Sequence, residues 1–422
     1  MTTSTTWRPL VTGGLAERLR ASLDEILVAM KSRSPLGEDP WIALLYAYAD
    51  RVERSDRHAA AFDAVVERAL ASVSEDVHSS ALYGGFTGVA WLANHTTEVE
   101  DGVEDPYEDI DATLRGLLAR SAGALDYDLI SGLVGIGVYF LERLAVSRAQ
   151  PVASECLAVI ADRLGELAEH TSAGATWFTD PTFLPEWQRE HAPNGYHNLG
   201  VAHGIPGIIA LLGQICEANL GGARARELLA RGVDWLLAQA STTGPSRFPA
   251  WCLKDAPRDP APGPPFAWCY GDLGLSVALL RAARCVDEPQ WEREAVEIAW
   301  NAAALREGGN GMPRDAGLCH GTAGVAHIFN RIFQATGDPT FEEAACLWFE
   351  RTLQMRHRGK GIAGYRAFHG LPKDRGGWVD DPGFLEGATG IGLSFLAATS
   401  EVEPDWDRLL LISVPPRPVR EA

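Results

Sequence analysis

The sequence predicts an all-α protein, an α/α toroid in which six or seven helical hairpins form a double-layered barrel. Pairs of glycines three residues apart recur six times, and each opens a segment that is apolar nearly all round. Helices with one apolar stripe and one charged face lie between these segments. A helix without a polar face must be buried on all sides, so we expect buried inner helices alternating with amphipathic outer ones. The pairs are Gly85–Gly88, Gly132–Gly135, Gly204–Gly207, Gly271–Gly274, Gly321–Gly324 and Gly387–Gly390.

The repeats favour a closed ring over an open solenoid, the other way in which such units stack. Successive pairs start between 47 and 72 residues apart, whereas solenoids keep a tighter period. Each pair stands at the start of an inner helix, so a ring would bring all six to one end. Polar residues beside the pairs would then face one cavity.

The elements follow in chain order within a single domain. Residues 1–80 are expected to supply N-terminal helices, including an amphipathic one whose apolar face starts at Leu15. Residues 81–400 hold the glycine pairs, and residues 401–422 are expected to form a C-terminal tail. Outer helices are predicted over Ala153–His170, Ala223–Gln239, Pro289–Trp300 and Pro339–Met355. The last two begin with a proline, which suits the first turn of a helix.

Two long stretches, residues 171–199 and 242–267, break this rhythm. They are rich in proline, glycine and tryptophan and only weakly periodic. Loops of this length are often lids or binding surfaces. An ordered insertion with no functional role is an equally good interpretation.

The charge and composition of the chain exclude several classes of function. The formal net charge of −19 argues against nucleic acid, because phosphate binding needs a basic surface. No apolar run is long enough to span a membrane, and the N-terminus lacks the features of a secretory signal, so we expect a cytoplasmic protein. Seven cysteines do not form an obvious disulfide framework.

Cys269 and Cys319 each lie two residues before a glycine pair, and His320 directly precedes one. In loops that turn into helices, they could form a Cys₂His zinc site with an open fourth position. Two thiolates and a neutral imidazole balance the charge of Zn²⁺, which suits activation of a further thiol. Ordinary buried cysteines and a capping histidine are the alternative, and the spacing leaves both open.

Two further polar residues precede glycine pairs, His203 and Asp128. A histidine facing the same cavity could move a proton, and an aspartate could tune it or position substrate. A structural hydrogen bond and a helix cap are the alternatives. His197, Asp272 and Glu386 occupy similar positions with weaker claims.

Three motifs in sequence, AHGIPG at Ala202, AWCYGDLG at Ala267 and LCHGTAG at Leu318, closely resemble the lanthionine synthetase C-like family over about residues 83–396. The resemblance implies an α/α toroid with zinc at one end, held by Cys269, Cys319 and His320. By the same resemblance, His203 and Asp128 match the catalytic histidine and aspartate. The implied reaction is Michael-type addition of a cysteine thiol to dehydroalanine or dehydrobutyrine, forming lanthionine or methyllanthionine.

The resemblance also implies partners. It predicts a stand-alone cyclase whose substrate is a dehydrated precursor peptide made by a separate dehydratase, and it allows a peripheral membrane-associated complex. Pro265 stands where bacterial members of the family often carry an arginine, and Lys254, Arg258 or Arg314 are candidates to compensate.

Two other functions stay open. One is a zinc protein of the same family that binds glutathione or adds it to dehydrated proteins. The other is a non-catalytic scaffold for the dehydratase. A toroidal glycosidase or terpene cyclase would need paired carboxylates or an aspartate-rich motif, which the glycine junctions lack.

Overall fold

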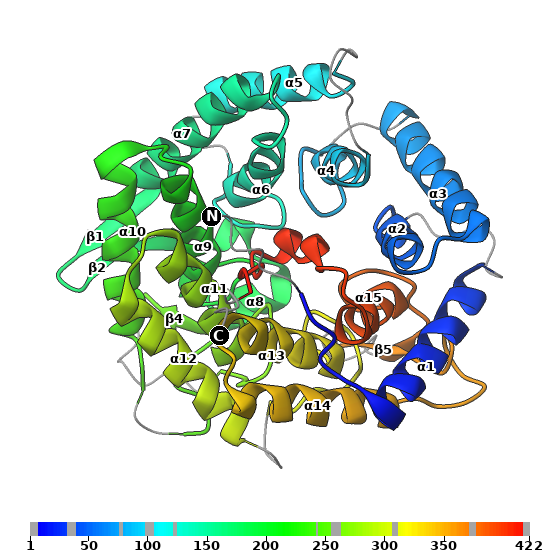
Figure 1. Cartoon of the computed structure of the whole chain (residues 1–422). Coiled ribbons are helices and arrows are strands. Elements are labelled where there is room, and N and C mark those ends of the chain that lie inside the picture. The colour runs from blue at the N-terminus through cyan, green and yellow to red at the C-terminus, as the bar shows by residue number, and fades with distance from the viewer. Residues whose placement is uncertain are drawn as a thin grey trace, which may run out of the picture.

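The computed structural model describes residues 7–31, 39–75, 79–97, 105–120, 125–241, 244–254, 263–305, 311–370 and 377–416. Within these ranges, most helices form two concentric layers around one axis (Figure 1). The inner helices are α2 (Ile42–Val52), α4 (Phe86–Thr96), α6 (Leu133–Arg143), α9 (Ile205–Glu217), α11 (Asp272–Cys285), α13 (Thr322–Thr336) and α15 (Ala388–Thr399). The outer helices are α1 (Gly13–Lys31), α3 (Asp56–Glu75), α5 (Glu108–Arg120), α7 (Gln150–Leu167), α10 (Gly222–Leu237), α12 (Pro289–Ala304) and α14 (Pro339–Gln354).

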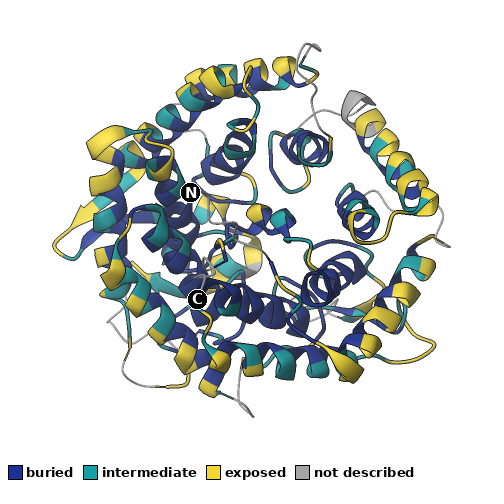
Figure 2. Cartoon of the chain, in the orientation of Figure 1, coloured by how far each residue is buried: buried dark blue, intermediate teal, exposed yellow. Residues whose placement is uncertain are grey.

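Burial separates the two layers as the sequence predicts. The inner helices are buried nearly all round, whereas the outer helices expose one face to solvent (Figure 2). Every residue of α9 from Ile205 to Gly213 is buried, for example, while α10 alternates buried and exposed positions. The predicted double-layered α/α toroid is confirmed, with seven inner helices among the described residues.

The ring is closed by the two ends of the chain. Helix α1 packs against α15 (Figure 1). Just before α1, the backbone N–H groups of Leu10 and Val11 both donate to the carbonyl of Ala398, at 2.9 and 3.2 Å. The indole of Trp7 donates to the carbonyl of Ala397 at 2.8 Å. The first helix of the chain is thus the outer partner of the last inner helix, and α15 in turn packs against the first inner helix, α2, which closes the inner ring.

Close backbone approach explains the repeated glycine pairs. The first glycine of each pair is the N-cap of an inner helix. The second lies in the first turn of the helix, where a Cβ atom on Gly324 would clash with the carbonyl oxygen of Leu318. A residue with a side chain could not take this place. In the same way, Gly88, Gly135, Gly207, Gly274 and Gly390 lie against the carbonyls of Leu82, Leu129, Val201, Trp268 and Phe384.

Backbone contacts also join successive glycine-pair loops to one another. The N–H of Tyr83 donates to Ile130, and that of Leu129 donates to Ala202, both at 3.0 Å. Farther along, the N–H of Trp268 donates to Cys319 at 2.8 Å. These bonds tie the loops together at one end of the barrel, so side chains on neighbouring loops are held in a fixed relation.

The two long stretches fold into a small antiparallel sheet that the sequence pattern does not predict. Its strands, in the order β1-β2-β3-β4, are β1 (Ala168–Thr171), β2 (Gly174–Thr179), β3 (Tyr196–Asn198) and β4 (Trp251–Leu253). A 3₁₀ turn η1 (Pro181–Phe183) and helix α8 (Glu186–His191) lie between β2 and β3. The predicted helix over Ala153–His170 is therefore wrong at its end, because α7 stops at Leu167 and the next residues pair with β2. A second pair, β5 (Ala367–His369) and β6 (Gly377–Val379), precedes α15.

The residues after α15 are packed into the core as far as the structure describes them. The 3₁₀ helix η2 (Asp405–Leu410) buries Trp406 and Leu409 completely. Its Asp407 forms a buried ion pair with Arg331 of α13, with Nε and Oδ2 2.6 Å apart. Across the described residues, none of the helices combines the length and the apolar character that crossing a membrane requires.

Candidate metal centre

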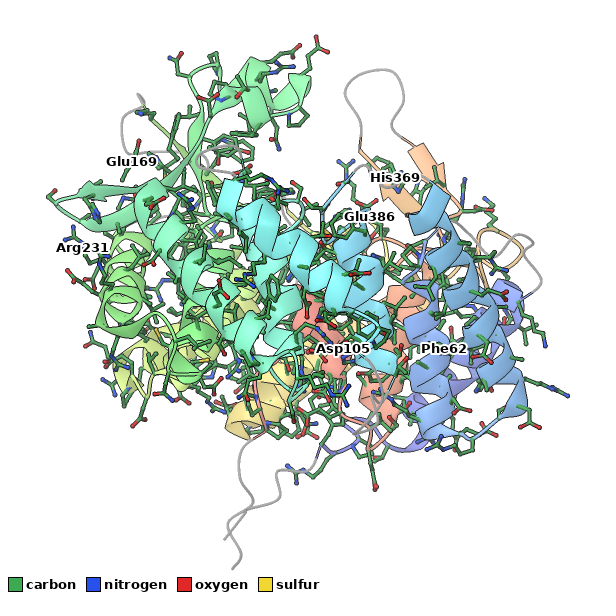
Figure 3. The ribbon with its side chains drawn as sticks, turned by 90° about the horizontal axis from the view of Figure 1, so that it is seen from above. Phe62, Asp105, Glu169, Arg231, His369 and Glu386 are labelled. Carbon is green, nitrogen blue, oxygen red and sulfur yellow. The ribbon has the colours of Figure 1, made fainter. Side chains whose placement is uncertain are left out.

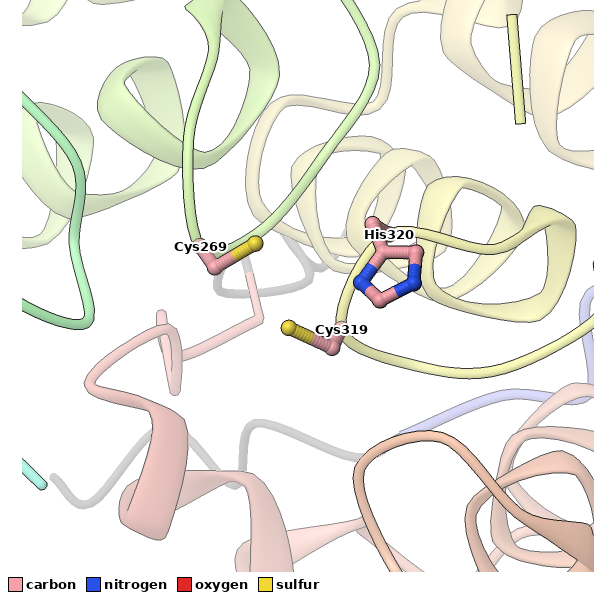
Figure 4. Close-up of side chains that lie close together, drawn as sticks. All are labelled: Cys269, Cys319 and His320. Carbon is pink, nitrogen blue, oxygen red and sulfur yellow. The ribbon is translucent and has the colours of Figure 1, made fainter. Parts of the chain in front are cut away.

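Cys269, Cys319 and His320 meet at the end of the barrel where the glycine-pair loops lie (Figure 4). Cys269 stands three residues before α11, and Cys319 and His320 stand three and two residues before α13. One ligand atom from each residue lies within 4.8 Å of the other two. The two loops are also joined through their backbones, because the carbonyl of Cys319 accepts the N–H of Trp268. Three donors from two linked loops thus converge on one point.

The charges of these groups suit a metal ligand set. The hydrogen bond from the Cys319 thiol lowers the pKa of Cys269 to about 5; burial opposes this shift and a hydrogen bond from His320 reinforces it. The pKa of Cys319 is raised because it donates that bond. Bonding to Cys269 raises the pKa of His320 to about 9. Cys269 is therefore a thiolate at neutral pH, the form that binds metal, and two sulfurs with one imidazole nitrogen fit Zn²⁺.

A buried carboxylate stands behind His320. Oδ2 of Asp315 lies 3.9 Å from Nε2 of His320, and the carboxylate accepts the backbone N–H groups of Gly317 and Phe368. Histidines that bind metals commonly have a carboxylate behind the ring, which orients the imidazole. Asp315 lies four residues before Cys319, outside the glycine-pair motifs, and sequence reasoning missed it.

His203 and Asp128 form a hydrogen-bonded pair. Nδ1 of His203 lies 2.6 Å from Oδ2 of Asp128, whose Oδ1 accepts the N–H of Ser131 at 2.9 Å. Asp128 therefore caps the turn before α6 and contacts His203 at the same time. The His203 side chain is 44% exposed, whereas that of Asp128 is 6% exposed. The imidazole is accessible while its carboxylate partner is shielded.

The His203–Asp128 pair lies close enough to Cys269 for the charge of the thiolate to affect the pKa of His203. Burial lowers the pKa of His203, but the hydrogen bond to Asp128 and the charges of Asp128 and Cys269 outweigh it, so the pKa is raised. The contact between the loops is direct, because Gly200 lies against the carbonyl of Cys269 and the ring of Tyr270. Asp126 lies nearby, and burial and the charge of Asp128 raise its pKa to about 6.

The small sheet borders this centre through aromatic residues. The side-chain amide of Asn198 in β3 donates to the hydroxyl of Tyr270 at 3.2 Å. Trp251 of β4 stacks on Tyr196, with ring centroids 5.6 Å apart, and meets Tyr270 edge-on at 6.3 Å. The two long stretches therefore contact the residue next to Cys269, an arrangement that the sequence left open.

The residues with weaker claims have other partners. His197 pairs with Glu169 at 3.0 Å. Asp272 is buried and accepts the N–H groups of Arg247 and Phe248, which holds the segment before β4. Glu386 pairs with His369 at 2.7 Å, and sequence reasoning missed His369 because no glycine pair accompanies it.

The candidates to compensate for Pro265 differ in position. Lys254 pairs with Glu169 at 3.4 Å, on the side of the sheet. Arg314 lies over the ring of Phe368 at 4.9 Å, in the loop whose Gly311 contacts Pro265. Arg258 lies outside the described residues.

The chain is similar to known proteins along most of its length. A family model described as lanthionine synthetase C-like protein matches residues 40–411. Nisin biosynthesis protein NisC of Lactococcus lactis subsp. lactis is 22% identical over 409 residues, covering 89% of this chain and 88% of that protein. The glutathione S-transferase LANCL1 of Danio rerio is 28% identical over 177 residues. That alignment covers 41% of this chain and only 38% of the fish protein.

The fold has a close counterpart among solved structures. A nisin cyclase structure superposes with a TM-score of 0.72 at 19% sequence identity. The superposition covers 94% of this chain and 96% of that one. At this level of identity, the likeness concerns the fold.

Proposed function

This chain belongs to the lanthionine synthetase C-like family, and from that premise we propose that it is a zinc-dependent lanthipeptide cyclase. It would add cysteine thiols of a dehydrated precursor peptide to dehydroalanine or dehydrobutyrine, forming lanthionine or methyllanthionine rings. The observation that carries the proposal is the convergence of Cys269, Cys319 and His320 in one electrostatic environment with the His203–Asp128 pair.

Cys269, Cys319 and His320 would hold the zinc ion. When bound, Zn²⁺ lowers the pKa of a substrate thiol and keeps the sulfur nucleophilic. The reaction forms a bond between this sulfur and the β-carbon of the dehydro residue. The electrons of the double bond move onto the neighbouring carbonyl as an enolate, and the α-carbon then gains a proton.

His203 would move the proton. Its Nδ1 is held by Asp128, which leaves Nε2 free to take the thiol proton or to give one to the α-carbon. Asp128 stabilises the protonated imidazole and fixes the orientation of the ring. Because Asp128 is itself anchored by Ser131, the imidazole is positioned before substrate arrives, and the motion needed in the reaction is small.

The partners follow from the same premise. The substrate would be a dehydrated precursor peptide supplied by a separate dehydratase, and we propose that the protein works in the cytoplasm. The match to nisin biosynthesis protein NisC along most of both chains supports the cyclase. The shorter match to the glutathione S-transferase LANCL1 favours a second candidate, in which glutathione is the thiol that is added. A non-catalytic scaffold for the dehydratase is the third.

A single assay distinguishes these functions. The zinc-loaded protein is incubated with a peptide containing one dehydroalanine and one cysteine, with and without glutathione. Ring formation leaves the peptide mass unchanged, so it is read as loss of the thiol that iodoacetamide would alkylate. We expect this loss without glutathione, and a loss slower by about 10²- to 10⁴-fold with His203→Ala. A product heavier by one glutathione would support the second candidate, and neither thiol loss nor glutathione addition in any condition would support the scaffold.

A further inference from the structure

A second cluster of metal-ligating side chains lies next to the candidate zinc centre, and we propose that His369, Asp381 and Glu386 bind a divalent transition-metal cation. His369 is the last residue of β5, Asp381 follows β6, and Glu386 directly precedes the glycine pair at the start of α15. Figure 3 shows His369 and Glu386 side by side at the end of the toroid where these strands lie.

The three donors converge as ligands would. Nε2 of His369 lies 2.7 Å from Oε2 of Glu386 and 3.3 Å from Oδ2 of Asp381. One ligand atom from each residue lies within 4.8 Å of the other two. A single N–H on Nε2 points at one oxygen at a time, whereas a cation can bind all three atoms together. All three side chains are partly exposed, so a cation can enter from solvent.

The backbone holds the donors in place. The other carboxylate oxygen of Asp381 accepts the N–H of Gly383 at 2.6 Å, and the carbonyl of Asp381 accepts that of Ala388 at 3.0 Å. The backbone of Glu386 is fixed because Gly317 packs against it. A ligand set positioned in this way loses little conformational entropy when it binds.

The surrounding charge attracts a cation. Asp39 and Asp315 stand near the cluster, so four carboxylates share a small volume with His369 and His320. Burial and the charge of Asp381 raise the pKa of Asp39 to about 6. Burial and the charges of Asp381 and Asp315 raise the pKa of Glu386 against the opposing effect of the two histidines. A bound cation would relieve this repulsion.

The donor set defines the kind of cation. Carboxylate oxygens suit Mn²⁺ and Mg²⁺, and an imidazole suits zinc, iron and other first-row metals. One imidazole with two carboxylates therefore favours Mn²⁺, Fe²⁺ or Zn²⁺ over Mg²⁺. The N–H of Cys319 donates to the carbonyl of Leu385 at 2.7 Å, which links this cluster to the first centre. A cation at this second site would be placed to coordinate the carbonyl oxygen of a peptide bound at the first centre.

Manganese provides a test that does not depend on activity. Full-length protein carrying one equivalent of Zn²⁺ is titrated with Mn²⁺, and free Mn²⁺ is measured by electron paramagnetic resonance. We expect one Mn²⁺ to bind per wild-type chain, and binding to weaken at least about 10-fold in Glu386→Gln and His369→Ala, because each loses a ligand. Glu386→Gln is nearly isosteric, so it keeps the result interpretable if His369→Ala folds poorly.

A matched control comes from the other side of the toroid. The pair His197–Glu169 has a similar distance, 3.0 Å, but Lys254 is its neighbour instead of a second carboxylate, and Glu169 lies far from His369 (Figure 3). His197→Ala should bind Mn²⁺ as wild type does. The proposal is overturned if wild type binds no Mn²⁺, or if Cys319→Ala abolishes binding while Glu386→Gln does not. The proposed function is tested separately, by zinc content and ring formation. Failure of Mn²⁺ binding would therefore leave the proposed function unaffected.

Discussion

Nδ1 of His203 lies 2.6 Å from Oδ2 of Asp128, although 75 positions separate the two residues in the chain. The contact exists because their loops precede the neighbouring inner helices α6 and α9 and are joined by the bond from Leu129 N–H to the carbonyl of Ala202. The ring architecture therefore brings together a histidine and a carboxylate that no local motif connects.

This contact predicts the direction in which Asp128→Asn changes the pKa of His203. In the wild type, burial lowers that pKa, while the hydrogen bond and charge of Asp128, together with the charges of Cys269 and Asp126, outweigh burial and leave the pKa above the usual 6.5. Asparagine keeps the shape but removes the charge, so burial should prevail and the pKa should fall. The imidazolium would then be lost at a lower pH. Titration of the His203 ring resonances by NMR measures this shift.

Asp126→Asn is the control for this experiment. Asp126 also raises the pKa of His203, but it is the smallest of the named contributions, so its removal should lower the pKa less. In ring formation, His203→Ala should reduce the rate by about 10²- to 10⁴-fold, the usual contribution of general acid–base catalysis. Equal pKa shifts in the two aspartate variants would contradict the assignment of Asp128 as the main partner.

The candidate zinc centre predicts the metal content of cysteine variants. Purified wild type should hold one zinc per chain, measured by inductively coupled plasma mass spectrometry, and Cys319→Ala should lose it because two donors remain. Cys346→Ala is the matched control, since Cys346 lies in α14 and its pKa is raised by burial. Wild type without zinc after reconstitution would refute the proposed centre.

Much of the fold could be predicted because the glycine pairs combine two physical requirements. Gly324 must lack a Cβ atom to pass the carbonyl of Leu318, and the apolar residues that follow it must be buried. Both requirements can be recognised in the sequence, the first as glycines three residues apart and the second as an apolar segment after each pair. The same junctions carry Cys269, Cys319 and His320, so a chemical pattern and a structural pattern coincide.

The strands and the second cluster could not be predicted, because each depends on contacts between distant segments. β3 and β4 are three residues each, too short for an alternating pattern, and they pair across more than 50 positions. His369 belongs to a short strand whose partner lies beyond residue 376. Its meeting with Glu386 is a consequence of the hairpin, which local sequence does not encode.

The buried ion pair between α13 and η2 predicts a large effect on stability. Arg331 is completely buried, and its guanidinium also contacts Glu403 and the carbonyl of Pro404. Arg331→Met removes the guanidinium that pairs with Asp407 and leaves the buried carboxylate with the imidazole of His327, 2.8 Å away, which should cost about 3–5 kcal/mol of unfolding free energy. Arg115→Met, which breaks the exposed pair with Glu155, should cost under about 1 kcal/mol. Urea unfolding followed by circular dichroism measures both, and similar losses would argue against the anchoring role.

Gly200 offers the sharpest test of how the loops build the candidate centre. It is buried, and a Cβ atom there would clash with the carbonyl of Cys269 and press on the ring of Tyr270. Because a carbonyl in a hydrogen-bonded loop cannot yield as a flexible side chain does, Gly200→Ala should displace Cys269. We expect a loss of about 1–3 kcal/mol in unfolding free energy, as for other overpacked sites, together with weaker zinc binding in a competition titration with a chromophoric chelator.

Gly14→Ala separates this effect from the general consequence of adding a methyl group. Gly14 is exposed in the first turn of α1 and no atom lies within 4 Å of the added Cβ. Alanine favours helix more than glycine does, by up to about 1 kcal/mol, so this variant should be as stable as wild type or more so and bind zinc equally well. If Gly200→Ala is destabilised but keeps full zinc affinity, the loop supports the fold without positioning Cys269. If it loses affinity while Gly14→Ala does not, the contact between the two loops determines the position of the ligand.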